Sequence, residues 1–136
     1  MSASGLATSP TAALRDLAAC IERLDADGCA ALMADDAVLI APFSPAPLPN
    51  RIDGAAAIGA TFRQIFGAFR SFAWVETEVH ATDDPELAFM TARSEIKLAN
   101  GGDYDQDYAM TARVRDGQIV EYCEYFDPIR AQRALA

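Results

Sequence analysis

The chain has 136 residues, of which 51% are hydrophobic, and carries a formal net charge of −9 at pH 7. This length predicts one domain with an internal core, and the excess of acidic residues argues against a nucleic-acid partner, which would require clustered Lys and Arg. No uninterrupted apolar stretch approaches the length of a membrane span and the N-terminus lacks the pattern of a secretory signal, so we expect no membrane partner.

A tail and one amphipathic helix open the predicted domain. Residues 1–8 are expected to form a flexible tail, and residues 9–136 a single domain. Ser9 followed by Pro10 is typical of a helix start, because serine caps a free backbone amide and proline fits the first turn. Apolar residues then recur at helical spacing at Leu14, Leu17, Ala18, Ile21 and Leu24.

Shorter elements and a loop follow. Residues 29–34 predict a short helix, and residues 37–41 a brief apolar strand. Four prolines within residues 42–49 exclude both helix and sheet, so this segment is expected to be a semi-rigid loop. Asp53 predicts the cap of a third helix. The apolar face of that helix would consist of Ile58, Phe62, Ile65, Phe66 and Phe69.

After Arg70 the apolar residues recur with period two, which is the period of a strand. Turn residues divide this region into four strands, over residues 72–82, 87–98, 104–115 and 118–126. A terminal helical turn follows. This order predicts an α+β fold in which about three helices pack on one face of a curved antiparallel sheet.

The turn before the last strand leaves two registers open. With a two-residue loop of Asp116 and Gly117, Glu124 lies opposite Ala109. With a three-residue loop and a bulge at Gly117, Glu124 lies opposite Tyr108. The second register would surround the carboxylate with aromatic and apolar groups, as in a small-ligand pocket. Periodicity does not choose between the two.

The cysteines and the histidine do not indicate a metal site. Cys20, Cys29 and Cys123 are widely spaced, and the only histidine, His80, has no partners at ligand spacing. Free thiols are typical of a reducing compartment. We therefore expect a cytoplasmic protein that uses no metal and no cofactor.

The element order and the ending RDGQIVEYCEYFDP resemble the nuclear-transport-factor-2-like superfamily, and within it the SnoaL-like group. The resemblance covers about residues 11–132, and phenazine-pathway proteins share mainly the same ending. It implies a conical fold with a central pocket between the helices and the concave sheet face. It also implies a homodimer formed through the sheet.

The enzymes of this superfamily differ in how well this chain matches them. Ketosteroid isomerases carry an Asp base where this chain has Ala41, so their chemistry is not expected. The pattern of limonene epoxide hydrolases is similar to Arg93 and Glu95 on one strand with Glu124 on the last. That resemblance implies Glu95 as the acid, Glu124 as the base and Arg93 as the bridge between them. In that family a Tyr and an Asn help to hold the reacting water molecule, whereas this chain has Leu39 and Ala41 at those positions. SnoaL-type cyclases also use an acid late in the sheet, again at Glu124.

We expect Glu124 to be the catalytic acid or base, with Glu95 and Arg93 in support, acting on a small and mostly apolar molecule. The reaction would be an isomerisation, a cyclisation or an epoxide hydration. The expected ligand-binding residues are Phe62, Phe66, Phe89, Gln106, Tyr108, Met110, Tyr122 and Phe126. Two alternatives stay open: a pocket that binds without chemistry, and an interaction dimer in which the three charged residues form a closed ion-pair network.

Overall fold

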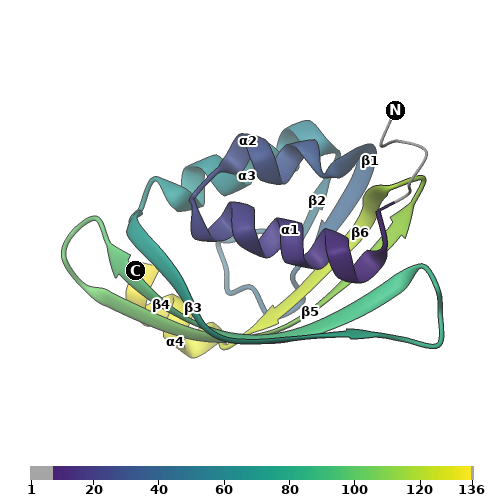
Figure 1. The fold of residues 1–136 in the computed structure, drawn as a ribbon. Coiled ribbons are helices and arrows are strands. Elements are labelled where there is room, and N and C mark those ends of the chain that lie inside the picture. Colours follow the sequence, from purple (N-terminus) through teal and green to yellow (C-terminus); the bar gives the residue numbers. More distant parts are fainter. Residues whose placement is uncertain (1–7, 136) are drawn as a thin grey trace.

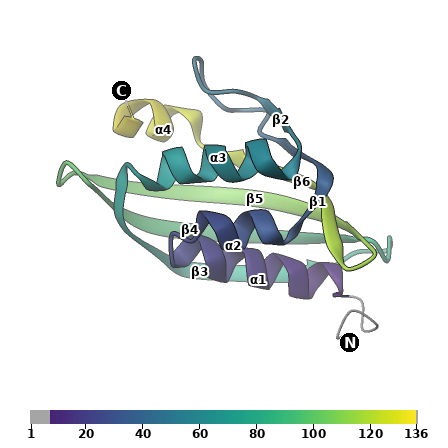
Figure 2. The same cartoon turned by 90° about the horizontal axis from the view of Figure 1, so that it is seen from above.

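The computed structural model describes residues 8–135, so most of the predicted tail lies outside the described residues. The helices are α1 (Pro10–Glu22), α2 (Ala26–Ala31), α3 (Ala55–Phe66) and α4 (Pro128–Leu135). The strands are β1 (Met33–Ile40), β2 (Arg51–Asp53), β3 (Phe69–Ala81), β4 (Leu87–Leu98), β5 (Asp103–Arg115) and β6 (Gln118–Phe126). Helices α1, α2 and α3 lie across the concave face of the curved sheet (Figures 1 and 2), which confirms the predicted α+β class.

The six described strands form one sheet in the order β2-β1-β6-β5-β4-β3. Strands β3 to β6 pair with their sequence neighbours in antiparallel fashion, as the sequence predicts. Strand β1 instead pairs in parallel with β6, so that Leu39 lies beside Tyr122 and the sheet is mixed rather than purely antiparallel. This long-range pairing brings the N-terminal half of the chain to the strand that carries Glu124.

The N-terminal caps of α1 and α3 show where the sequence predicted the start of a helix correctly and where it did not. Helix α1 begins as predicted, because the Oγ of Ser9 accepts a hydrogen bond from the amide of Ala12 at 3.2 Å. At α3 the N-cap is Gly54, with a φ of 94° that favours glycine, and not Asp53. Asp53 belongs to β2, where its carboxylate accepts a hydrogen bond from Arg51. The predicted cap at Asp53 was therefore wrong by one residue.

The β5–β6 hairpin combines a two-residue turn with a bulge. Asp116 and Gly117 form the turn with φ angles of 52° and 77°. The register then shifts by one residue at Val120, which has no partner on β5. Glu124 consequently lies opposite Met110, which is neither of the two registers predicted from the sequence.

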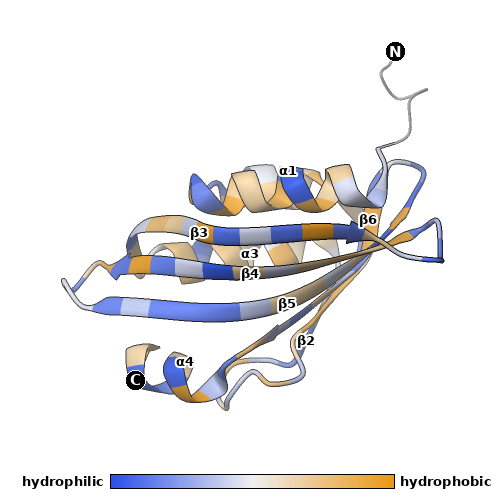
Figure 3. Ribbon diagram, turned by 60° about the horizontal axis from the view of Figure 1, so that its bottom comes forward, coloured by the Kyte–Doolittle hydropathy of each residue, from blue (hydrophilic) through white to orange (hydrophobic). Residues whose placement is uncertain are grey.

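Each long strand has one face toward the helices and one face away from them. On β4 and β5 the even-numbered residues face the helices and are mostly buried, whereas the odd-numbered ones are mostly exposed or half-buried. Figure 3 shows the resulting alternation of hydrophilic and hydrophobic residues, and places α4 beside β5, past the end of β6. The largest fully buried apolar side chains are Leu14, Leu17, Ile58, Met90, Ile96, Met110, Ile119 and Tyr122.

Candidate functional site

Glu124 lies on the inner face of β6. Its Oε1 accepts a hydrogen bond from the hydroxyl of Tyr122 at 2.8 Å, and the same hydroxyl lies 2.9 Å from the Sδ of Met110. Burial raises the pKa of the Glu124 carboxyl above its usual range, and the hydrogen bond from Tyr122 opposes this with a smaller effect. This carboxyl therefore holds its proton closer to neutral pH than an exposed carboxyl would, which suits proton exchange with a ligand.

Three tyrosines share this interior with the carboxyl group. Burial raises the pKa of Tyr104 to about 12. Burial also raises the pKa values of Tyr108 and Tyr122 well above their usual range. The negative charge of Glu124 contributes to the increase at all three. The three side chains are therefore neutral hydroxyl groups near pH 7.

Two fully buried polar side chains hold the tyrosines of β5. The Oγ of Ser94 donates to the hydroxyl of Tyr108 at 3.1 Å, and the Nε2 of Gln106 donates to the hydroxyl of Tyr104 at 2.8 Å. Gln106 also donates to the carbonyl of Asp127 at 2.9 Å, and its Oε1 accepts from the backbone amides of Asp107 and Asp127, each at 3.0 Å. These bonds use the whole capacity of the amide. Gln106 thus positions the β6–α4 turn, which corrects the prediction that it binds a ligand.

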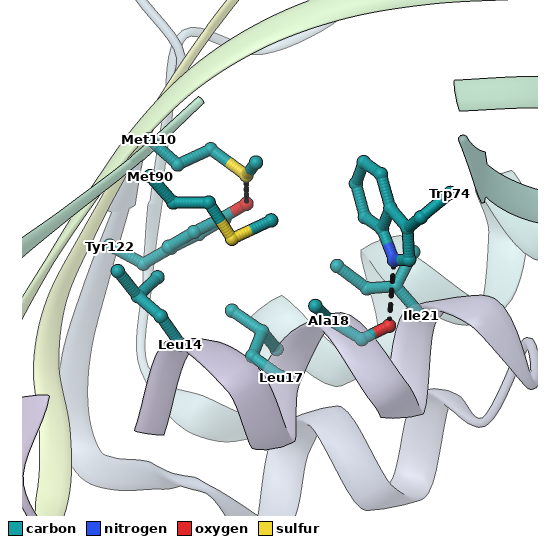
Figure 4. Close-up of a pocket in the computed structure, with 8 residues that line it drawn as sticks. All are labelled: Leu14, Leu17, Ala18, Ile21, Trp74, Met90, Met110 and Tyr122. Atoms are coloured by element: carbon teal, nitrogen blue, oxygen red, sulfur yellow. Dashed lines mark hydrogen bonds between the residues drawn. The ribbon is translucent and has the colours of Figure 1, made fainter. Parts of the chain in front are cut away.

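An apolar space adjoins Tyr122 between α1 and the sheet (Figure 4). It is lined by Leu14, Leu17, Ala18, Ile21, Trp74, Met90, Met110 and Tyr122. The space is too narrow to hold a water-sized sphere. Trp74 closes one side, because its indole N–H donates to the carbonyl of Ala18 at 2.9 Å. A ring-sized ligand therefore requires α1, Trp74 or the two methionines to shift.

Arg93 and Glu95 lie on the opposite face of the sheet from Glu124. The Nε of Arg93 donates to Asp107 at 3.2 Å, and 55% of the Arg93 side chain is exposed. Glu95 is exposed on the same face. The prediction that Arg93 and Glu95 act beside Glu124 was wrong, because β4 buries its even-numbered residues. Neither the epoxide-hydrolase constellation nor the closed ion-pair network is assembled.

The predicted ligand-binding residues divide into several groups. Met110 and Tyr122 line the apolar space. The ring of Tyr108 lies edge-on to Trp74, with ring centroids 5.3 Å apart. Phe126 lies opposite Tyr108 in the sheet but does not line the space.

The remaining phenylalanines do not reach the space. Phe62 and Phe66 lie together in α3 with ring centroids 5.4 Å apart, and they belong to the core. Phe89 is on the outer face of β4, where its ring stacks with that of His80 at 6.5 Å. The prediction that Phe89 lines the pocket was wrong for the same reason as for Arg93.

Sequence reasoning missed Tyr104, Ser94 and Trp74. A signal for Ser94 and Tyr104 was present, because each is in phase with the apolar residues of its own strand. Giving the apolar face of β4 priority over its charged face would have placed Ser94 inside. Trp74 directly precedes a bulge in β3, and no sequence signal marks that bulge.

Residues 8–135 contain no group of three or more His, Cys, Asp or Glu side chains that could hold a metal ion. In the same part of the chain, no helix is both long enough and apolar enough to cross a membrane.

The elevated pKa of Glu124 predicts a pH dependence of stability. In the unfolded chain the carboxyl titrates near its usual pKa of about 4.3, so the folded state binds more protons between that value and its own higher pKa. The contribution of Glu124 to the free energy of unfolding should therefore fall as the pH rises through this interval. The Glu124→Gln variant lacks this titration, so it should gain stability relative to the wild type with increasing pH.

Urea unfolding of both proteins between about pH 4 and about pH 8 measures this difference. The background effect of the other acidic groups cancels in the comparison. A difference that stays constant over the whole range would contradict a buried carboxyl at position 124.

Comparison with known proteins adds independent information. A family model described as SnoaL-like domain matches residues 14–122. An uncharacterized PhzA/B-like protein from Pseudomonas aeruginosa is 31% identical over 116 residues, which cover 85% of this chain and 82% of that protein. A proposed isomerase from Bacillus subtilis has a similar structure, with a TM-score of 0.81, 26% identity, and coverage of 90% of this chain and 89% of the other. A Mycobacterium tuberculosis protein in complex with estradiol-17beta-hemisuccinate gives a TM-score of 0.72 at 25% identity, covering 88% and 95% of the two chains.

Proposed function

This chain belongs to the SnoaL-like domain family, and from that premise we propose that it performs cofactor-free acid/base chemistry on a small, mostly apolar molecule. The observation that carries the proposal is the position of Glu124, a carboxyl with a raised pKa beside the hydroxyl of Tyr122 and the apolar space. A raised pKa brings this carboxyl closer to the pH at which it can both take and give a proton, whereas an exposed carboxyl stays ionised.

The chemistry proposed for Glu124 is proton transfer at a carbon next to a carbonyl group. The carboxylate takes the proton, and the electron pair of the broken C–H bond moves toward the carbonyl oxygen to give an enol or enolate. The protonated Glu124 then returns the proton to another atom, which completes an isomerisation or assists a cyclisation. The Tyr122 hydroxyl suits both states of the carboxyl, because it can donate to the ionised Glu124 or to the Sδ of Met110.

Binding without chemistry is the second candidate. It is favoured by the single hydrogen bond to Glu124, since within residues 8–135 only Tyr122 bonds to this carboxyl group. The complex of the Mycobacterium tuberculosis relative with estradiol-17beta-hemisuccinate supports a small ligand in either case. Turnover of a ligand would exclude this candidate, and saturable binding without turnover would favour it.

Ligand binding is expected to change the fluorescence of Trp74, the only tryptophan of the chain. A ring-sized molecule in the apolar space lies against Trp74, because this side chain lines the space. Two-ring ketones should therefore cause a saturable change in Trp74 emission, and at about 100 times Kd they should stabilise the fold by about 2.7 kcal/mol. A panel that changes neither the emission nor the melting temperature would contradict the proposed pocket.

We also propose the homodimer through the outer face of the sheet. On that face the small side chains Ala109, Thr111 and Cys123 lie beside the exposed ring of Tyr125, with Ala109 paired to Tyr125 and Thr111 paired to Cys123. Phe43 extends the patch by packing edge-on against Tyr125, with ring centroids 5.3 Å apart. The free thiols of the chain are consistent with the cytoplasmic location that we propose.

An Ala109→Arg variant tests this dimer. The wild type should sediment with twice the 14.6 kDa mass of the chain. The variant should sediment with the mass of one chain, because an unpaired charge would be buried at the interface. Ala99→Arg, in the exposed turn between β4 and β5, is the matched control and should leave the mass unchanged. A wild type that sediments as a single chain would contradict the proposal.

A further inference from the structure

The two oxygen atoms of the Glu124 carboxyl have different surroundings. Oε1 accepts a hydrogen bond from the hydroxyl of Tyr122 at 2.8 Å. Oε2 bonds to no group among residues 8–135, and no unpaired side-chain oxygen in that part of the chain is completely enclosed. Glu124 is half-buried, so Oε2 is the part of the carboxyl that keeps contact with solvent. One oxygen is therefore held by the protein, and the other can be reached from outside.

The hydroxyl of Tyr122 has a second acceptor on the neighbouring strand. Its oxygen lies 2.9 Å from the Sδ of Met110, and Figure 4 draws this contact. The register of the sheet places both acceptors, because Glu124 lies directly opposite Met110. Only 1% of Tyr122 is exposed, so water does not compete for its hydroxyl. Since a hydroxyl has one hydrogen to donate, this hydrogen points either at the carboxyl or at the sulfur.

The strength of the two acceptors changes with the charge of Glu124. An ionised carboxylate accepts hydrogen bonds that are about twice as strong as neutral ones, whereas a thioether sulfur is a weak acceptor. When the carboxyl is protonated, it loses the advantage of its charge and the sulfur can compete. The hydrogen of Tyr122 is therefore expected to turn from Oε1 to Met110 when Glu124 gains a proton, and to return when Glu124 loses it.

From these contacts we propose that Tyr122 and Met110 are positioning residues for Glu124, which hold Oε1 and leave Oε2 as the atom that exchanges a proton with the ligand. The proposal rests on the proposed function, because it assigns the reacting atom of that chemistry. When the C–H bond of the ligand breaks, its proton forms the new O–H bond at Oε2, and its electron pair stays with the ligand and moves toward the carbonyl oxygen. Tyr122 keeps its own proton throughout and only reorients its hydroxyl.

The other titratable groups around this pair do not interfere with the titration of Glu124. Burial raises the pKa of Tyr104 and that of Cys29, in α2, to about 12 each. Burial also raises the pKa values of Tyr108 and Tyr122 well above their usual range. These four groups are therefore uncharged between about pH 4 and about pH 8, and Glu124 is the one of the five that titrates there.

A carbon-13 NMR titration of the Glu124 carboxyl tests this positioning, because it needs no ligand. In Tyr122→Phe the ionised carboxylate loses its donor, so the titration midpoint should rise by about one pH unit. In Met110→Leu the protonated state loses the second acceptor of the Tyr122 hydroxyl, so the midpoint should fall by roughly 0.5 pH unit. Met90→Leu is the matched control and should leave the midpoint unchanged. Met90 is as enclosed as Met110, but within residues 8–135 its sulfur contacts no hydroxyl.

The double variant Tyr122→Phe with Met110→Leu separates positioning from packing. Met110 is proposed to act only through the hydroxyl of Tyr122, so adding Met110→Leu should not move the midpoint of Tyr122→Phe. An effect of packing or polarity at Met110 would instead move the midpoint equally in both backgrounds. Circular dichroism confirms that each variant is folded. Met110→Leu and Met90→Leu nearly preserve volume, so this pair decides the proposal even if Tyr122→Phe is unfolded.

The outcomes also distinguish the positioning from the proposed function. A midpoint that does not rise in Tyr122→Phe, or does not fall in Met110→Leu, would overturn the positioning, while deuterium exchange of a ketone by the wild type would leave the proposed function in place. In each variant the pH profile of that exchange should shift with the midpoint, and a profile that does not shift would overturn the role of the held carboxyl. Opposite midpoint shifts without any exchange by the wild type would support the hold on Oε1 and overturn the proposed chemistry, together with the role of Oε2 in it.

Discussion

Replacing Glu124 with Gln should reduce the rate of proton exchange in a bound ketone by about 10²- to 10⁴-fold, which is the range of general acid–base catalysis. The substitution keeps the shape of the side chain and its contact with Tyr122, but it removes the group that takes and returns the proton. The measurement is deuterium incorporation from heavy water next to the carbonyl of 2-tetralone, a two-ring ketone, followed by proton NMR. The wild type should accelerate the exchange over buffer alone.

Glu121→Gln is the matched control for this experiment. Glu121 is on the same strand, but it lies on the outer face and is exposed, so its replacement should leave the exchange rate unchanged. If Glu124→Gln retained the wild-type rate, Glu124 would not be the acid/base group. If Glu121→Gln lost as much rate as Glu124→Gln, the effect would come from the charge of the protein as a whole.

The second large effect is expected from Gln106→Met, a substitution that nearly preserves volume but removes every hydrogen bond of the amide. The amide and carbonyl of Asp127 would lose their partners in a partly buried place, and the hydroxyl of Tyr104 would lose its donor. An unpaired buried polar group costs about 1–3 kcal/mol. We therefore expect the free energy of unfolding to fall by about 3 kcal/mol or more, measured by urea titration.

Gln118→Met is the control, because Gln118 is exposed at the start of β6 and makes only a long contact of 3.5 Å with the carbonyl of Met33. Its effect should stay within about 0.5 kcal/mol. A loss below about 1 kcal/mol for Gln106→Met would show that the amide does not hold the β6–α4 turn. The prediction concerns stability and is independent of any ligand.

Much of the fold was predictable because its signals are local. Ser9 and Pro10 start α1 as predicted, and alternation with turn residues locates the four long strands. The parallel pairing of β1 with β6 was not predictable, because it joins segments that are far apart in the sequence. The bulge at Val120 was missed for a different reason, since it has no glycine or proline to mark it.

The candidate site was predictable only in part. Glu124 was expected from its place among aromatic residues on β6, and it lies on the inner face. Arg93 and Glu95 were chosen because their charges resemble a catalytic pattern, but an inner face is set by the burial of apolar side chains. The neutral partners of the site, Ser94 and Tyr104, carry no charge; their phase with the apolar residues of their strands predicts that they are buried, but it does not predict which groups they contact.

The pKa of Glu124 tests the central claim most directly, because the proposed chemistry depends on a buried carboxyl whose pKa is raised above its usual value. Carbon-13 NMR of protein labelled at the glutamate carboxyl groups can follow the titration, with the Glu124 signal assigned by its loss in Glu124→Gln. We predict a pKa above the usual value of about 4.3. A Glu124 signal that titrates at or below that value would contradict the account, because the carboxyl would then be solvated and permanently ionised near pH 7.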